Sequence, residues 1–308
     1  MIRLATRASA LALAQARSVA DRLERGGARV QIVPMRTEGD RRAEARLAAV
    51  GGKGLFVREI EEALLRGDVD VAVHSLKDLP AELPPGLTLA IFPEREDARD
   101  VLVTRDGHGL ESLGRGAVVG TSSPRRRAIV LSLRPDLVVT PIRGNVDTRL
   151  AKLATREWDA VLLAAAGLRR LGVAPRHATA LPPDVFVPAV GQGVLGVEAR
   201  ADDAATQAAL RPIDHAPTRA CALAERAFLA RLGASCVTPI AAHARHGDAR
   251  VVMDALVLSE DGREVLREHA EGSAADPAAL GRRVAEALLA RGAARMVALR
   301  PVGVSGGR

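Results

Sequence analysis

An apolar strand, a polar turn and a helix follow one another repeatedly over the first two thirds of this chain. The apolar runs at residues 2–5, 69–73 and 158–164 are strand-length, and each gives way to polar or small residues before a helical pattern begins. Strands that alternate with helices pair into parallel or mixed sheets covered by helices on both faces. The sequence therefore predicts an α/β fold.

The pattern is interrupted at three places that suggest domain boundaries. The strand at 87–92 ends in the polar segment 94–99, which reads as a hinge, and a strand at 194–198 could return the chain to the first unit. From about residue 216 a long helix, three strand-like runs and a last helix replace the alternation. The sequence predicts a first α/β domain, a second α/β domain and a small α+β C-terminal domain, at 1–93 with 194–214, 94–193 and 215–308. Two crossings between the α/β domains would leave a cleft.

The charge indicates an anionic partner. The 308 residues carry a formal net charge of +7, with no tyrosine and aromatic residues at 2%. Single-stranded nucleic acid is usually bound by stacking on aromatic side chains, so small polyanions fit better, although genomic base composition is another source of arginine. Two cysteines imply no disulfide framework and fit a reducing cytoplasm. The helical segment 9–25 is broken by charges and is neither a signal peptide nor a membrane span.

The segment from His74 to Pro80 is the best candidate for chemistry. It follows a buried strand, and open α/β sheets bind ligands at the carboxyl ends of their strands. Lys77 is one of only three lysines in an arginine-rich chain, which suggests a compact ammonium with a tunable pKa, with an ordinary surface ion pair with Asp78 as an equal alternative. Asp78 is best read as stabilising a cationic intermediate, with helix capping or an ion pair as alternatives. His74 is expected to be a core histidine.

Further basic residues stand at strand ends and helix starts. A cation at a helix N-terminus opposes the macrodipole unless an anion binds there, although a solvated arginine is the simpler alternative. Together these residues would suit a ligand with several carboxylates or phosphates. The residues are Arg7, Lys77, Arg125, Arg126, Arg143, Arg149 and Arg170.

The cysteines and the polar segment 36–54 carry weaker signals. Cys221 lies in an alanine- and leucine-rich helix and is expected in the core, and Cys236, judged alone, also fits a small buried hydrophobe. His243 and His246 without further ligands predict no metal site. The glycine-containing segment 36–54 lacks periodicity and is expected to be a mobile lid or disordered.

Six motifs in one order resemble the porphobilinogen deaminase (hydroxymethylbilane synthase) family. They lie at residues 5–9, 50–56, 74–80, 120–123, 143–149 and 188–193. The resemblance implies two periplasmic-binding-protein-like domains flanking a cleft, plus a C-terminal domain with a cofactor cysteine. The Cys-x-x-Pro-Ile pattern assigns a dipyrromethane thioether to Cys236. The family's usual glycine pair before this cysteine is replaced by Ala234 and Ser235, and Pro124 stands where leucine is common.

The resemblance also implies an activity and a set of site residues. The family is a transferase that joins four porphobilinogen molecules head to tail, releasing ammonia, and gives hydroxymethylbilane for tetrapyrrole and heme biosynthesis. Asp78 would act with Arg7 and Arg143 at the reacting centre. The implied cofactor contacts are Cys236, Lys77, Asp78, Arg125, Arg126, Ser123 and Thr121. The implied substrate contacts are Arg7, Ser9, Ser75, Arg143, Arg149, Arg170 and Gln192. Lys53 and Phe56 would belong to the lid.

Two other functions remain open from the residues. A non-catalytic anion-binding module would leave Cys236 unmodified and would not explain the third domain. A basic nucleic-acid-binding protein would bind with a steep dependence on salt. The resemblance favours a cytoplasmic monomer whose partners are porphobilinogen and oligopyrrole intermediates, with no metal, nucleic acid or membrane.

Overall fold

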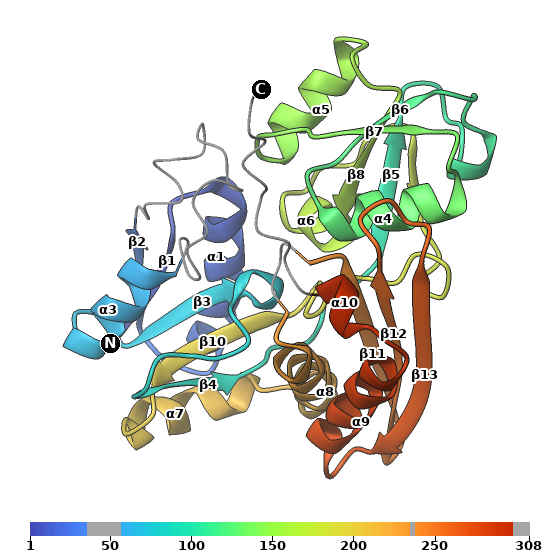
Figure 1. Cartoon of the computed structure of the whole chain (residues 1–308). Helices are drawn as coiled ribbons and strands as arrows, with labels where there is room; N and C mark the ends of the chain where they lie inside the picture. Colours follow the sequence, from blue (N-terminus) through green and yellow to red (C-terminus); the bar gives the residue numbers. More distant parts are fainter. Residues whose placement is uncertain (36–56, 235–237, 298–308) are drawn as a thin grey trace, which may run out of the picture.

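The computed structural model describes residues 1–35, 57–234 and 238–297. It contains three sheet-centred units, drawn at the left, the upper right and the lower right of Figure 1. The mixed α/β fold with a smaller third domain that the sequence predicts is confirmed.

The first unit is a five-stranded mixed sheet in the order β2-β1-β3-β10-β4. Strands β1, β2 and β3 run parallel, and β10 is antiparallel to both its neighbours. Helix α1 packs one apolar face of the sheet and α3 the other. The elements are β1 Ile2–Arg7, α1 Ala10–Arg25, β2 Val30–Met35, α3 Arg58–Arg66, β3 Val71–Ser75, η2 Leu76–Asp78, β4 Leu87–Ile91, β10 Leu195–Arg200, α7 Ala204–Leu210 and η4 Arg211–Ile213.

Helix α1 shows how the sequence sets these elements. Ser9 caps it by accepting a hydrogen bond from the backbone N–H of Ala12 at 3.3 Å. The apolar positions Ala16, Val19 and Leu23 recur at helical spacing and are buried against the sheet. The helix is held beside the end of β1, so Ser9 and Arg7 are fixed at the same edge of the sheet.

Strand β3 differs slightly from the expected run. It begins at Val71 instead of residue 69 and continues through His74 to Ser75. Asp70 lies just before the paired strand, and its carboxylate forms an ion pair with Arg3, whose Nη2 lies 2.6 Å from Oδ1. The extension makes His74 a buried strand residue, as expected, and places Ser75 at the strand end.

The second unit repeats the design with the strand order β7-β6-β8-β5-β9. Strands β6, β7 and β8 are parallel, and β5 is antiparallel to β8 and β9. The elements are β5 Asp100–Thr104, η3 Leu110–Ser112, β6 Val118–Gly120, α4 Pro124–Leu133, β7 Val138–Thr140, α5 Val146–Ala154, β8 Ala160–Ala164, α6 Ala165–Arg170 and β9 Ala178–Ala180.

Two segments connect these units. Residues 92–99 lead from β4 to β5, and residues 181–194 return from β9 to β10. The backbone N–H of Glu96 donates to the carbonyl of Gly193 at 3.1 Å, which joins the two crossings. Since β10 completes the first sheet, we propose 1–93 with 194–214 and 94–193 as the two α/β domains.

The third unit is an antiparallel sheet of three strands covered by two helices. Strand order is β11-β12-β13, and Phe228 and Leu280 bury the helices against it. Strand β13 runs on to Ser273 although its apolar signal in the sequence is weak, because its side chains alternate between exposed and half-buried. The elements are α8 Ala216–Leu232, β11 Ile240–Gly247, β12 Arg250–Leu258, β13 Val265–Ser273, α9 Pro277–Ala290 and α10 Ala294–Val297.

Candidate functional site

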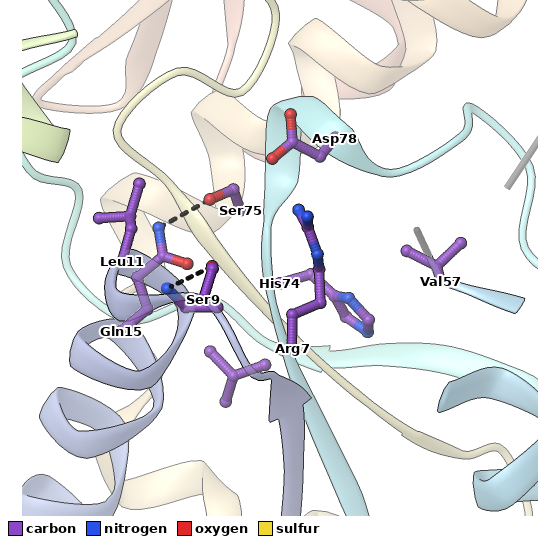
Figure 2. Close-up of a pocket in the computed structure, with 10 residues that line it drawn as sticks. Arg7, Ser9, Leu11, Gln15, Val57, His74, Ser75 and Asp78 are labelled. Carbon is purple, nitrogen blue, oxygen red and sulfur yellow. Dashed lines mark hydrogen bonds between the residues drawn. The ribbon is translucent and has the colours of Figure 1, made fainter. Parts of the chain in front are cut away.

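A small pocket lies where β1, α1 and β3 end together in the first unit (Figure 2). It has a volume of about 50 Å³, and its lining includes Arg7, Ser9, His74, Ser75 and Asp78. Figure 2 shows the side chain of Arg7 extending toward the carboxylate of Asp78. The structure thus brings together four residues that the sequence assigns to the site and the neighbouring His74.

The polar wall of this pocket is held by α1. The amide of Gln15 donates to the hydroxyl of Ser75 at 2.7 Å, from a glutamine that is itself buried. Ser75 and Ser9, the cap of α1, therefore keep fixed positions beside the 3₁₀ turn η2, which carries Asp78 at its exposed end.

Lys77 is half-buried on η2, next to Asp78. Burial is the main cause that lowers the pKa of its ammonium to about 8; the nearby Arg126 and Arg125 act in the same direction, and Asp78 and Asp100 oppose them. Lys77 of the first unit therefore lies within electrostatic range of the arginine pair of the second unit. This agrees with the tunable ammonium that the sequence suggests.

Arg125 and Arg126 converge on a single buried carboxylate, Asp100. Arg125 Nη1 lies 2.8 Å from Oδ2, Arg126 Nη2 lies 2.7 Å from Oδ1, and Gln192 donates to Oδ1 at 3.2 Å. Burial opposes the charge on Asp100, but the two guanidiniums outweigh it and hold its pKa at about 2. One carboxylate for two arginines leaves a net positive charge.

Asp100 was not among the residues that the sequence singles out. Its signal is weak: a lone aspartate directly after the 94–99 hinge, at the start of an apolar strand. Only the fold shows that β5 brings this carboxylate under the start of α4. The finding also shows that Arg125 and Arg126 have a structural partner besides any ligand.

The remaining basic residues of the second unit lie in two places. Arg143 is exposed in the turn before α5, and Arg149 on α5 donates from Nε to the carbonyl of Gly144 at 2.9 Å. Burial and then Arg126 lower the pKa of Arg149, so it belongs to the same positive cluster as Arg126. Arg170 instead lies at the crossings, where its Nη2 donates to the carbonyl of Gly193 at 2.7 Å.

A second cavity, of about 260 Å³, opens at the start of α4. Thr121, Ser123, Arg127 and Glu260 line it, the last from the turn between β12 and β13. Ser123 caps α4 by accepting from the N–H of Arg126 at 3.4 Å, and Pro124 occupies the first turn of the helix without breaking it. The additional basic residue Arg127 donates to the carbonyl of Val139 at 2.7 Å and so supports β7.

The third unit is tied to both crossings through Glu225 on α8. Arg95 Nη1 lies 2.6 Å from Glu225 Oε1, and the carboxylate also accepts the N–H groups of Gly191 at 2.6 Å and Ala244 at 2.8 Å. Sequence reasoning missed this residue, because a glutamate within a helix carries no local sign of such partners.

Cys221 is buried in the core of the third unit, as expected. Burial and then Glu225 raise the pKa of its thiol to about 11, so it is a poor nucleophile at neutral pH. Cys236, Lys53, Phe56 and the expected lid at 36–54 lie outside the described residues.

His243 is held neutral, because burial and the nearby Arg95 and Arg245 lower its pKa to about 3. Within residues 1–35, 57–234 and 238–297, histidine, cysteine and carboxylate side chains form no group suited to a metal. None of the helices in those ranges is both long and apolar enough to cross a membrane.

Comparison with known proteins covers nearly the whole chain. The family model "Porphobilinogen deaminase, dipyromethane cofactor binding domain" matches residues 2–208, and "Porphobilinogen deaminase, C-terminal domain" matches residues 219–290. The porphobilinogen deaminase of Syntrophotalea carbinolica is 49% identical over 299 residues, covering 96% of this chain and 95% of that protein. That of Desulforudis audaxviator is 50% identical over 295 residues, covering 95% and 96%.

Among solved structures, a periplasmic substrate-binding protein of an ABC transporter from Coxiella burnetii matches 71% of this chain and 93% of its own, with 18% identity and a TM-score of 0.43. That similarity is too distant to bear on function. The two family models together span most of the chain, and the relatives are nearly half identical to it over almost their full length. The chain belongs to the porphobilinogen deaminase family.

Proposed function

We propose that this protein is a hydroxymethylbilane synthase, a transferase of tetrapyrrole and heme biosynthesis. It joins four porphobilinogen molecules head to tail with loss of ammonia, and hydrolysis then releases hydroxymethylbilane. The observation that carries the proposal is the near full-length match to porphobilinogen deaminases. The positive cluster of Lys77, Arg125, Arg126 and Arg149 suits such a substrate, because each porphobilinogen carries an acetate and a propionate.

The residues present fit the dipyrromethane cofactor that the family uses. Asp100 neutralises only one of the two guanidiniums it binds, and buried Arg125 Nε has no hydrogen-bond partner among the described residues. Lys77 adds a desolvated ammonium beside them. The carboxylates of a dipyrromethane would balance this excess positive charge. When bound, the cofactor supplies the primer to which porphobilinogen units are joined.

The cofactor contacts that we propose are the cations that make up this excess positive charge and the hydroxyls nearest to them. Lys77, Arg125 and Arg126 hold carboxylates, and the hydroxyls of Thr121 and Ser123 lie at the cavity beside the start of α4. Attachment is proposed at Cys236 through a thioether. Its rival thiol, Cys221, is buried and protonated at neutral pH, which supports this choice.

The reacting centre that we propose lies at the pocket of Figure 2. The Asp78 carboxylate stabilises the positive charge that develops on porphobilinogen as its aminomethyl group loses ammonia. Arg7, which extends toward Asp78, orients that carboxylate, and Arg143 assists from the second domain. The other substrate contacts proposed are Ser9, Ser75, Arg149, Arg170 and Gln192.

Arg170 and Gln192 support the site from the crossings. Each already bonds to backbone there: Arg170 to Gly193, and Gln192 to the carbonyl of Ala98 at 2.7 Å. A ligand contact at these residues would link binding to the relative position of the two α/β domains. We further propose that the enzyme acts as a cytoplasmic monomer, that Lys53 and Phe56 belong to a lid, and that 215–308 forms the cofactor-bearing domain.

The experiment that tests the function combines mass and turnover. The intact mass of freshly purified protein should exceed the sequence mass by one dipyrromethane, and peptide mapping should place the adduct on Cys236. Cys221→Ala is the matched control and should keep the adduct. Incubation with porphobilinogen should release ammonia and hydroxymethylbilane. Unmodified Cys236 in an active preparation would refute the attachment, and no ammonia release from modified protein would refute the function.

A further inference from the structure

A buried cluster of ionisable side chains lies directly behind the pocket wall. His74 Nε2 lies 3.1 Å from Glu198 Oε2, with side-chain exposures of 4% and 0%. In the β3–β10 register Gly196 stands opposite His74, so Glu198 is its diagonal neighbour on the same sheet face. Helix α3 covers that face and contributes the buried Glu61.

The carboxyl groups of this cluster are incompletely hydrogen-bonded. Glu198 Oε1 and Glu61 Oε1 are both buried, and neither has a partner within the described chain. Burial and then the charge of Glu198 raise the pKa of Glu61 to about 7, although His74 opposes this. Glu61 is therefore only partly ionised near neutral pH: its protonated form provides the kind of donor that Glu198 Oε1 lacks, and its ionised form adds a negative charge beside His74.

The charges around the cluster come from three further elements. Arg226 on α8 is electrostatically coupled to Glu198, and its Nη2 donates to the carbonyl of Ala81 at 2.8 Å. Arg7 at the end of β1 and Asp78 on η2 line the pocket together with His74 (Figure 2). His74 is thus the member of the cluster that also borders the pocket.

The hydrogen bond to Glu198 determines which ring nitrogen of His74 is basic. A neutral imidazole places its N–H on the nitrogen that faces a carboxylate, here Nε2. Nδ1 then carries the lone pair, and it has no hydrogen-bond partner within the described ranges. A carboxylate behind an imidazole stabilises the imidazolium that forms when the free nitrogen takes up a proton.

We propose that His74, Glu198 and Glu61 form a proton relay that opens into the pocket through His74. The proposal rests on the function proposed above, which requires a proton acceptor. When porphobilinogen adds to the pyrrole ring of the unit bound before it, the C–N bond breaks and ammonia leaves with the electron pair. The ring carbon forms the new C–C bond and then loses its proton, whose electron pair returns to the ring. His74 Nδ1 accepts that proton and releases it to water through the pocket before the next unit is added.

Glu198 and Glu61 act as positioning residues in this relay. Glu198 fixes the tautomer and stabilises the imidazolium, and Glu61 adjusts the proton affinity of the pair by its own charge. Removing the negative charge of Glu61 should make His74 a weaker base, because a nearby anion favours the protonated imidazole. The acid limb of the activity profile should then move to lower pH.

The first test uses Glu61→Gln, which keeps the shape of the side chain. We expect the acid limb of kcat against pH to move down by roughly half a pH unit, because Glu61 is only partly ionised below pH 7, and the NMR titration curve of His74 in histidine-labelled protein to move in the same direction. Glu62→Gln is the matched control, because Glu62 on the same helix is exposed and pairs with Arg58. It should change neither. Identical profiles and titrations for Glu61→Gln and the unsubstituted protein would overturn the relay.

The second test uses His74→Gln, which still offers Glu198 an N–H donor but cannot take up a proton. With cofactor loading checked by mass, kcat should fall on the order of a hundredfold, with KM within about twofold. Turnover close to that of the unsubstituted enzyme would also overturn the relay. If the unsubstituted enzyme itself releases no ammonia from porphobilinogen, the proposed function fails, whereas the His74 titration still decides whether the three residues are coupled.

Discussion

Replacement of Asp100 by asparagine should destabilise the second domain strongly. The substitution Asp100→Asn keeps the size of the side chain but removes the counter-charge of Arg125 and Arg126, which bind Asp100 at 2.8 and 2.7 Å. All three side chains are at least nine-tenths buried, so water cannot easily replace the lost carboxylate.

Two routes give the magnitude of this loss. Removing one partner of a buried ion pair typically costs ~3–5 kcal/mol, because the other partner stays buried without a counter-charge. Separately, folding lowers the pKa of Asp100 from 3.8 to about 2, and at ~1.36 kcal/mol per unit this corresponds to roughly 2 kcal/mol. The linkage figure is smaller because it counts only protonation of the carboxylate. We expect a loss of ~2–5 kcal/mol.

The direction of the Asp100 pKa shift determines how the stability difference between the two proteins changes with pH. The pKa of Asp100 is depressed in the folded state, so its stabilisation is fully present above its unfolded value of 3.8 and is lost as pH falls through about 2. The difference between the two proteins should therefore be constant from pH 7 to about pH 5 and should shrink in stronger acid.

Urea unfolding at pH 7 and pH 5 measures this difference. Glu62→Gln again serves as control, because an exposed pair such as Arg58–Glu62 contributes at most ~1 kcal/mol. A free energy of unfolding for Asp100→Asn within ~0.5 kcal/mol of the unsubstituted protein would refute the reasoning. It would mean that the buried guanidiniums reach other acceptors at little cost.

Three further predictions concern the ligand site. Asp78→Asn, loaded with cofactor and saturated with porphobilinogen, should turn over on the order of a hundred- to a thousandfold more slowly, and near-normal turnover would contradict its electrostatic role. Arg149→Lys should mainly raise KM, since the bidentate fork is lost, and a purely kcat effect would contradict a binding role. Because burial lowers the pKa of Lys77 to about 8, affinity of cofactor-free protein for a dicarboxylate should fall as pH rises through that value. Calorimetry should show no such step in Lys77→Gln.

The sequence by itself determined the local architecture. Apolar periodicity located the strands, and the helical segment expected at 9–25 is confirmed as α1, which begins at the Ser9 cap. The scarcity of lysine, three residues among many arginines, pointed to Lys77, whose pKa is indeed displaced. These features depend on neighbours a few residues apart, so a linear pattern contains them.

Only the tertiary structure decided which charged groups, far apart in the sequence, come into contact. Asp100 meets Arg125 and Gln192 because β5 runs beneath α4 and beside the returning crossing. His74 meets Glu198, 124 positions further along the chain, because β10 returns to the first sheet and pairs with β3. Strand order and the two crossings set these contacts, and no local period encodes them. Burial makes these contacts important for stability, because a charge that is removed from water is costly unless the fold supplies a partner for it.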